Sequence, residues 1–265
     1  MKRVLLFLWI LVACNSGEDN NAVNQKVISE PEPLQTEVIG EEAEQENVPQ
    51  FAVYPRLKEE IAEAFLEEFG ATHLETRILM KTDYGEIEVE LFDDTPFHRA
   101  NFLYLIERDY FSPTQLVRVV KGFVIQGGNS EEVEDQEQRF LIGDYTLPSE
   151  LKPHHLHLPG ALAMSRSYDN NPDKRSSAYD FYIVDGAKVS QVGMFQAQEK
   201  SGMNYSEAQK DLYFKQGGTP HLDMEHTVFG RVTKGMDVVT ELANLPTDAS
   251  EWPIKEVKIF MEVLY

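Results

Sequence analysis

The first apolar segment of the chain is a short, unbroken run at its start. Val4 to Ile10 follows the basic pair Lys2-Arg3, and the segment closes on Leu11-Val12-Ala13-Cys14. A run of this length cannot cross ~30 Å of hydrocarbon as a helix, and a basic segment before it is typical of a cleaved export signal. The pattern predicts a signal peptide over residues 1–13.

Residues 14–50 have no periodic apolar pattern. Nine acidic side chains and three prolines lie after Cys14, against one basic residue, Lys26. Such a composition cannot bury enough apolar surface to offset the entropy of the chain. We therefore expect an acidic, disordered tether over residues 14–50.

Pro55 to Phe69 repeats apolar residues at helical spacing, with glutamates on the other side. The expected buried face consists of Leu57, Ile61, Ala64 and Phe65. Pro55 suits a first helical turn and Gly70 a C-terminal cap. The pattern predicts a helical extension over residues 51–76. It either packs on the main domain, which we favour, or docks a partner.

From residue 77 onward the apolar pattern changes to that of short strands. Ile87-Glu88-Val89-Glu90-Leu91 alternates strictly after the turn-forming Asp83-Tyr84-Gly85. Strands are expected at 78–81, 86–91, 117–120, 123–126, 161–165, 181–184, 227–232 and 257–264. Helices are expected after Thr95-Pro96, an N-cap with proline at the first position, and at 236–244. This order predicts a mostly β fold, a closed eight-stranded antiparallel barrel with two flanking helices.

Residues 189–218 do not fit the spacing of the strands. Ser206 with Gln209 three residues later is typical of a helix start. Leu212, Tyr213 and Phe214 supply apolar contacts. We interpret the segment as a helical insertion in a domain spanning residues 77–265.

Charge and cysteine content narrow the range of partners. The 265 residues carry a formal net charge of −21 with 42% hydrophobic residues. This balance argues against nucleic acid, which needs clustered lysine and arginine. Cys14 is the only cysteine, so no intramolecular disulfide can form. Nothing in the sequence indicates more than a monomer.

Three segments carry candidate chemistry. The first is Arg118-Val-Val-Lys-Gly-Phe-Val-Ile-Gln-Gly-Gly128, and the second is Ala161-Leu-Ala-Met-Ser-Arg166. The third joins Leu222-Asp223 to His226-Thr-Val-Phe-Gly-Arg-Val232. Their types and order resemble the cyclophilin-type peptidyl-prolyl cis/trans isomerases over residues 77–265, which is more specific than any single motif.

The resemblance implies a role for each matching residue. The catalytic arginine falls on Arg118. The substrate-binding positions fall on Phe123, Val124, Gln126, Met164, Ser165, Asp180, Tyr182, Leu222 and His226. Substrates would be proline-containing polypeptides, with no cofactor or metal. Asp180 replaces a glutamine that is common in the family, and Arg166 replaces an asparagine.

The chemistry of the X–Pro bond favours the same residue types. Rotation crosses ~18–20 kcal/mol because the nitrogen lone pair is delocalised into the carbonyl. Catalysis needs an apolar slot for the proline ring and a donor that favours the twisted amide. Arg118 would donate to the prolyl nitrogen. Phe123, Met164, Tyr182 and Leu222 would hold the ring.

Other interpretations remain open at this point. Each apolar residue could be ordinary barrel core, and Gln126 or His226 could satisfy a buried hydrogen bond. An acid at Asp180 could pair with Arg118 and occupy its donors. The protein would then be a non-catalytic, proline-peptide-binding chaperone. A third possibility is a scaffold that docks a partner through the 55–69 helix and the insertion.

His154, His155 and His157 invite a metal-site interpretation. Their spacing is loose, and no nearby acid or cysteine completes a ligand set. We interpret the segment as a loop with incidental histidines and expect no metal site.

Leu11-Val12-Ala13-Cys14 resembles a bacterial lipobox, which implies cleavage before Cys14 and lipidation of its thiol. An ordinary signal peptide with an incidental cysteine is the alternative. The resemblance implies a cell-envelope protein, membrane-bound only through the lipid, on the outer membrane facing the periplasm or on the cell surface. Its expected function is to assist the folding of exported proteins.

Overall fold

The computed structural model describes residues 54–130 and 132–265. The signal peptide, Cys14 and the tether lie outside these residues, so they remain predictions. Within the described ranges, no helix has both the length and the apolar character needed to span a bilayer.

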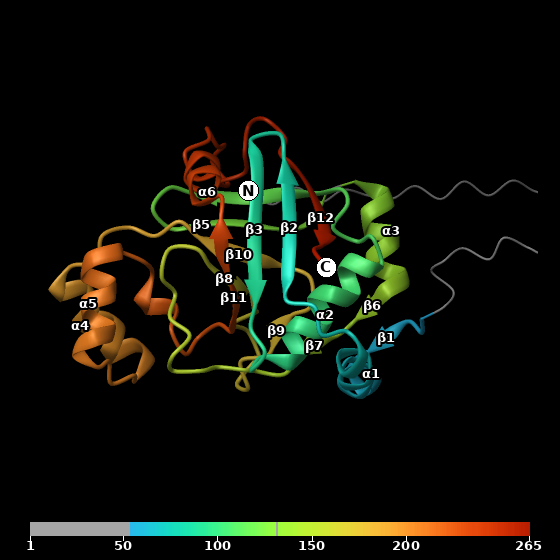
Figure 1. Ribbon diagram of the computed structural model, residues 1–265, viewed down its shortest axis with the longest axis horizontal. Coiled ribbons are helices and arrows are strands. Elements are labelled where there is room, and N and C mark those ends of the chain that lie inside the picture. The colour runs from blue at the N-terminus through green and yellow to red at the C-terminus, as the bar shows by residue number, and fades with distance from the viewer. Residues whose placement is uncertain (1–53, 131) are drawn as a thin grey trace, which may run out of the picture. The chain divides into compact units, whose positions relative to one another are not determined.

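Eight antiparallel strands close into a barrel, which confirms the predicted fold (Figure 1). The strands are β2 (Arg77–Thr82), β3 (Gly85–Leu91), β4 (Thr114–Val120), β5 (Val124–Asn129), β8 (Ala161–Met164), β10 (Phe181–Val184), β11 (Val228–Lys234) and β12 (Lys258–Val263). Their order around the barrel is β10-β5-β4-β12-β2-β3-β11-β8, and β8 pairs with β10 to close it. The hairpin β2–β3 joins at the predicted turn, with Thr82 opposite Gly85.

The two predicted flanking helices are α2 (Pro96–Glu107) and α6 (Met236–Ala243). The Phe102 ring of α2 contacts Phe111, Phe181 and Phe229 in the barrel core, with centroids 5.0–5.7 Å apart. Pro96 stands at the start of α2 as expected, but the Thr95 side chain makes no cap hydrogen bond. The Glu150 carboxylate replaces it and accepts from the first free amides of the helix, at 3.2 and 2.9 Å.

The predicted N-terminal helix starts later than expected, and of its expected buried face Leu57 and Phe65 pack against the core whereas Ile61 and Ala64 are exposed. Residues 57–58 instead form β1 (Leu57–Lys58), parallel to β6 (Gly143–Asp144), and α1 runs over Glu59–Thr72. Its buried side chains are Ala62, Leu66 and Phe69, whereas Ile61 is 42% exposed. Gly70 lies inside the helix and does not cap it, and its missing side chain lets α1 approach α2, since a Cβ there would stand 3.0 Å from that of Ala100. Packing on the main domain is confirmed.

One helix was not predicted. α3 (Val133–Ile142) follows the second strand of the motif segment, and Val133, Phe140 and Leu141 are largely exposed on it. Its polar composition hides the helical period because it buries only Ile142. A short strand pair, β7 (Thr146–Leu147) with β9 (Ser176–Ser177), completes this side.

The segment 189–218 is helical, as predicted, but it holds two helices. They are α4 (Gln191–Ser201) and α5 (Glu207–Gln216), drawn in orange at one end of Figure 1. Ser206 and Gln209 form the expected capping box of α5. Leu156, Met194, Met203, Tyr205 and Tyr213 form a small core beneath the helices. The short helix η2 (Pro220–Leu222) then leads back to the barrel.

Candidate active site

The alternation of residues along β5, β8 and β10 creates a cavity on the outer face of the barrel. Ile125, Leu162 and Ile183 point into the main core, whereas Val124, Ala163 and Tyr182 belong to a separate apolar cluster. Above that cluster lies a cavity of about 290 Å³. It is lined by Arg118, Phe123, Val124, Gln126, Ser165, Arg166, Tyr168, Tyr182, Leu222 and His226. The structure thus brings all the predicted site residues to one cavity except Met164, Asp180 and the undescribed Cys14.

The Gly127-Gly128 pair allows β5 to lie close to its neighbours. A Cβ on Gly128 would stand 2.0 Å from the Tyr179 carbonyl oxygen, and its φ is +95°. A Cβ on Gly127 would stand 2.7 Å from Ile259. Only glycine fits at position 128, while a side chain at position 127 would displace Ile259, so the pair lets the strand that carries Gln126 pack closely.

Arg118 lies on β4, opposite Gln126, with its guanidinium 5.5 Å from the centre of the Phe123 ring. Its Nε donates to Glu251 Oε2 at 2.6 Å. The Glu251 backbone carbonyl also accepts from the Val119 amide at 2.8 Å. Two hydrogen bonds therefore connect the loop that carries Glu251 to β4. Within the described residues neither Nη group of Arg118 donates a hydrogen bond. A charged, oriented donor therefore lines a cavity that has an apolar floor and a partly polar rim.

The pair between Asp180 and Arg118 that the sequence left open does not form. Asp180 Oδ2 accepts from Ser177 Oγ at 2.7 Å and lies 4.0 Å from Arg139 Nη2. Asp180 precedes β10 and does not line the cavity. The acid that Arg118 meets is Glu251, which is 133 residues away in the sequence.

The expected position of the Met164 side chain in the cavity is also wrong. Alternation along β8 puts it with Leu162 in the barrel core, where it is fully buried beside Phe181. Only its backbone faces the site, because its carbonyl oxygen lies 3.1 Å from His226 Nδ1. Ser165, the next residue, reaches the cavity as predicted.

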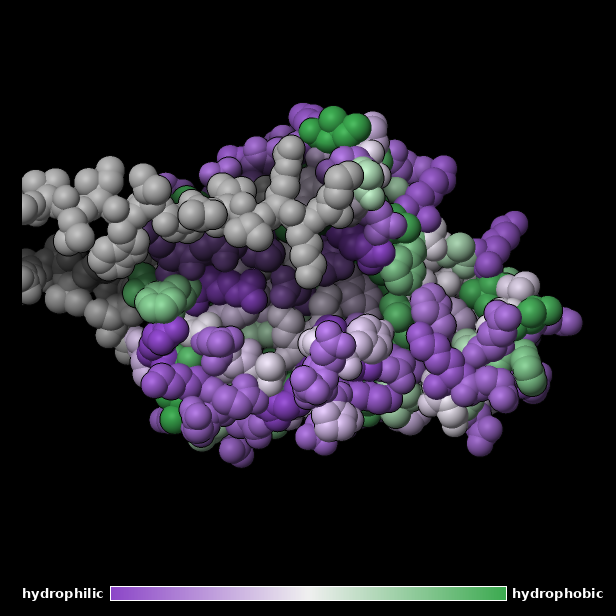
Figure 2. All heavy atoms as spheres, turned by 180° about the vertical axis from the view of Figure 1, so that it is seen from behind, coloured by the Kyte–Doolittle hydropathy of each residue, from purple (hydrophilic) through white to green (hydrophobic). Residues whose placement is uncertain are grey.

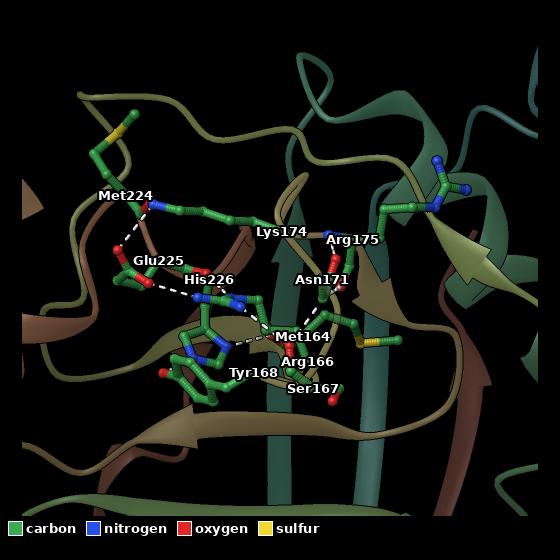
Figure 3. A network of polar contacts seen from close by, with 10 residues as sticks. All are labelled: Met164, Arg166, Ser167, Tyr168, Asn171, Lys174, Arg175, Met224, Glu225 and His226. Carbon is green, nitrogen blue, oxygen red and sulfur yellow. Dashed lines mark hydrogen bonds and ion pairs between the residues drawn. The ribbon is translucent and has the colours of Figure 1, made fainter.

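His226 is held at the rim by hydrogen bonds on both ring nitrogens (Figure 3). Nδ1 donates to the Met164 carbonyl, and Nε2 accepts from the Tyr168 hydroxyl at 2.8 Å. Burial lowers the pKa of His226 to about 4. The imidazole is therefore neutral at pH 7 and cannot compete with Arg118 as a cation.

A network of charges supports this rim from behind. Arg166 donates to the Glu225 carbonyl at 2.6 Å and its carboxylate at 2.5 Å, and its guanidinium lies 4.2 Å over the Tyr168 ring. Lys174 reaches the other Glu225 oxygen at 2.8 Å. Burial raises the pKa of the Glu225 carboxyl, but these two cations outweigh it and lower the pKa overall. Figure 3 shows the residues converging from two loops.

A buried chain of hydrogen bonds connects the cavity floor to the insertion. The Tyr182 hydroxyl lies 2.9 Å from His157 Nε2, and His157 Nδ1 donates to Asp223 Oδ1 at 2.8 Å. Asp223 Oδ2 accepts from the hydroxyls of Tyr205 and Tyr213, at 2.7 and 2.6 Å. Burial raises the pKa of both of these tyrosines, so both remain donors. His157, which stood in a histidine run, is thus a structural residue of the floor.

Apolar side chains are exposed on α4, a helix of the insertion. Val192 and Phe195 on α4 are 67% and 64% exposed, and α4 packs on η2, which carries Leu222. Figure 2 shows hydrophobic side chains among hydrophilic ones at the end of the molecule that bears the insertion. His221, at the rim, stacks on Phe123 with the ring centres 5.6 Å apart.

Sequence reasoning missed Glu251 and Tyr168 at the site. Neither belongs to the three motif segments. Tyr168 lines the cavity, and Glu251 reaches Arg118 from a loop. The sequence does contain the information that would have placed Met164 correctly. Small residues at 161, 163 and 165 alternate with Leu162 and Met164, which predicts that the two larger side chains share the inward face.

Comparisons with known proteins agree with this geometry. The family model described as cyclophilin type peptidyl-prolyl cis-trans isomerase/CLD matches residues 77–263. A protein of Staphylococcus aureus (strain USA300), provisionally named a peptidyl-prolyl cis-trans isomerase, is 27% identical over 209 residues. The match covers 78% of this chain and 96% of the relative. A Streptococcus pyogenes serotype M6 protein, provisionally named a bifunctional phosphatase/peptidyl-prolyl cis-trans isomerase, is 28% identical over 71% of this chain and 38% of its own length.

Solved structures show the same fold. The crystal structure of a Cryptosporidium parvum cyclophilin type peptidyl-prolyl cis-trans isomerase matches with a TM-score of 0.51 and 22% identity, over 72% of this chain and 98% of that one. A structure of that protein in the presence of the dipeptide Ala-Pro has a TM-score of 0.50. Family match, barrel and cavity agree, and the chain belongs to the cyclophilin-type peptidyl-prolyl cis/trans isomerase family.

Proposed function

We propose that the protein accelerates cis/trans isomerisation of X–Pro bonds in exported polypeptides, with Arg118 as the catalytic residue. The observation that carries this proposal is the position of the Arg118 guanidinium. It lines the cavity above the apolar floor, is held through Nε alone, and has both Nη groups without a hydrogen-bond partner in the described part of the chain.

The cavity suits a proline ring that remains in place while the amide twists. Phe123, Tyr182 and Leu222 form apolar walls, and Val124 is 2% exposed behind them. The side-chain amide of Gln126 makes no hydrogen bond within residues 54–130 and 132–265, so it can bind the substrate backbone. Holding the ring and one side of the chain restricts the rotation to the bond itself.

Arg118 would act on the transition state and not on the planar amide. When the bond twists, the prolyl nitrogen regains its lone pair and becomes an acceptor, which the planar amide nitrogen is not. An Nη–H group of Arg118 that donates to this nitrogen stabilises only the twisted form. The reaction forms and breaks no covalent bond, so no nucleophile is required.

The test is the cis-to-trans relaxation of a short Xaa-Pro peptide with the full chain and its Arg118→Ala variant. We expect the variant to lose about 100-fold or more in kcat/KM, because one transition-state donor is removed. Arg77→Ala is the matched control, because the exposed Arg77 pairs with Glu88 across β2 and β3 and does not line the cavity. Equal acceleration by Arg118→Ala and the parent would contradict the role of Arg118.

A second candidate is a module that binds proline-containing segments without catalysis. Two observations favour it: the ion pair between Arg118 and Glu251, and the exposed apolar side chains of α4. Peptide binding by a folded parent protein that gives no acceleration would select this function. Deleting the exposed apolar groups by Val192→Ser and Phe195→Ser would then weaken binding of unfolded chains, measured by fluorescence anisotropy.

We also propose a place of action, on the basis of the N-terminal sequence. We expect lipidation at Cys14, a monomer tethered to the outer membrane, and proline-containing exported chains as substrates. The supporting features are the basic and apolar start of the chain and the acidic stretch behind it. The lipid should be detected by mass spectrometry of the N-terminal peptide, and Cys14→Ser should release the protein from membrane fractions.

A further inference from the structure

Two histidines of the run at residues 154–157 meet an acid that lies sixty residues away in the sequence. Asp94 lies in the turn between β3 and α2, and His154 and His155 lie in the loop between β7 and β8. His154 Nε2 is 2.9 Å from Asp94 Oδ2, and His155 Nε2 is 2.7 Å from Asp94 Oδ1. One ligand atom of each residue lies within 4.8 Å of the others. The acid that the histidine run lacks in sequence is present in space.

The loop holds its two rings in a convergent arrangement. The side chains of sequence neighbours usually diverge, yet these two ring centres are 4.3 Å apart and face one carboxylate. The His155 ring stacks on Phe92 at 4.1 Å, and its side chain is only 14% exposed. The loop is fixed from the insertion, because Gln209 of α5 donates to the Pro153 carbonyl at 2.9 Å.

The donor set points to one class of ion. We propose that Asp94, His154 and His155 bind one divalent transition-metal ion of the zinc class. Two imidazole nitrogens and a carboxylate oxygen suit zinc, cobalt, nickel or copper, whereas magnesium and calcium prefer oxygen ligands alone. Three protein ligands leave a tetrahedral ion one position for water.

The observed spacing is close to what such an ion needs. Ligand atoms around tetrahedral zinc lie about 3.4 Å apart, given metal–ligand bonds of about 2.1 Å. The contacts of 2.9 and 2.7 Å run to different oxygens of Asp94, so the one that belongs to the ligating oxygen must widen by roughly 0.5–0.7 Å, and the other histidine must turn toward the same ion. The His154 and Asp94 side chains are 64% and 44% exposed, so both can make this adjustment. The more buried His155, which stacks on Phe92, is expected to keep its position.

The site is separate from the proline cavity and has its own surroundings. Both histidines line a groove of about 400 Å³ whose apolar wall includes Phe92, Leu158 and Val228. No residue of the proposed site lines the cavity that holds Arg118. An ion bound here would join the turn before α2 to the loop before β8, so it would stabilise the folded state by binding it alone.

The test is calorimetric titration of the full chain with zinc chloride, with every protein carrying Cys14→Ser so that no thiol binds the ion. We expect saturable one-to-one binding by the parent, weakened at least ~10-fold by Asp94→Asn and by the exposed His154→Ala. His73→Gln is the matched control, because His73 pairs with a single acid, Glu107, at 3.2 Å. It should bind zinc like the parent, and magnesium chloride should give no binding.

Thermal unfolding gives an independent readout. Zinc should raise the midpoint for the parent and His73→Gln but not for Asp94→Asn or His154→Ala, while isomerase activity without zinc confirms that all are folded. The proposal is overturned if the parent shows no saturable one-to-one binding. It is equally overturned if both site variants keep the affinity of the parent.

Discussion

At the scale of single residues, the segment from Arg118 to Gly128 predicted several residues of the cavity. It did not predict the acid that holds the Arg118 guanidinium. Phe123 and Gln126 lie on the same short segment as Arg118, so a local pattern could place them together. Glu251 comes from a loop 133 residues away, and only closure of the barrel brings it to Arg118. The resemblance to the family put Met164 in the cavity, whereas the alternation of side chains along its strand puts it in the core.

Glu251 is expected to position Arg118. Glu251→Ala should lower kcat/KM about 5-fold, because the pair is partly exposed and an ion pair of this kind contributes little. Glu251→Gln should recover most of the loss, since its amide oxygen can still accept from Nε. If Glu251 only stabilised the loop, this recovery would not depend on an acceptor for Arg118. Peptide isomerisation kinetics measure both variants.

Glu256→Ala is the matched control for Glu251, because Glu256 accepts from Gln115 and does not touch Arg118. It should leave kcat/KM unchanged. A rise in kcat/KM on Glu251→Ala would contradict the positioning role. It would mean that Glu251 withholds the guanidinium from substrate, as the binding-module function requires.

At the scale of elements, the sequence predicts the helices and strands that bury a regular apolar face. Helices that bury only one or two side chains show no such pattern. β3 alternates strictly and was found within one residue. α3 buries one side chain, and α4 buries only Met194 and Ala197, so neither shows a clear helical period. The capping box of α5 was visible because it depends on local hydrogen bonds alone.

The attachment of the insertion to the cavity floor gives an element-scale prediction. Tyr213→Phe removes one hydroxyl donor from the buried Asp223 carboxylate and should cost about 1.5–3 kcal/mol of unfolding free energy. Urea unfolding followed by tryptophan fluorescence measures the change. Tyr84→Phe is the control, since its hydroxyl has no hydrogen bond within the described residues. Equal unfolding free energies for the two variants would show that the hydroxyl of Tyr213 contributes nothing.

At the scale of the whole molecule, the closed barrel could be predicted because eight strand patterns and two helices occur in a fixed order. The sequence could not predict which loops lie side by side. Asp94 with His155, and Asp223 with Tyr213, become neighbours only after the barrel has closed. Both groups surround the loop 153–159, so the same segment contacts the proposed ion site on one side and the cavity floor on the other.

The pH dependence of global stability should carry the signature of His226. Its pKa is about 4 in the folded protein because of burial, against 6.5 for the ordinary side chain. Below pH 6.5 the unfolded chain takes up a proton at this histidine while the folded chain does not, so the folded state loses stability as the pH falls. The loss from this group between pH 7.5 and pH 5 is about 2 kcal/mol.

Urea unfolding of the parent and His226→Asn at those two pH values isolates this contribution. The variant should be less stable at pH 7.5, because the hydrogen bonds to Met164 and Tyr168 are altered. Its stability should fall less steeply with acid by about 2 kcal/mol, since it has no imidazole to protonate in the unfolded chain. An equal fall in both proteins would mean that His226 is protonated as easily in the fold as in the unfolded chain. The rim of the cavity would then gain a positive charge below pH 6.5, beside Arg118 and the Arg166 that Glu225 already pairs, and the neutral imidazole inferred for the rim would hold only above that pH.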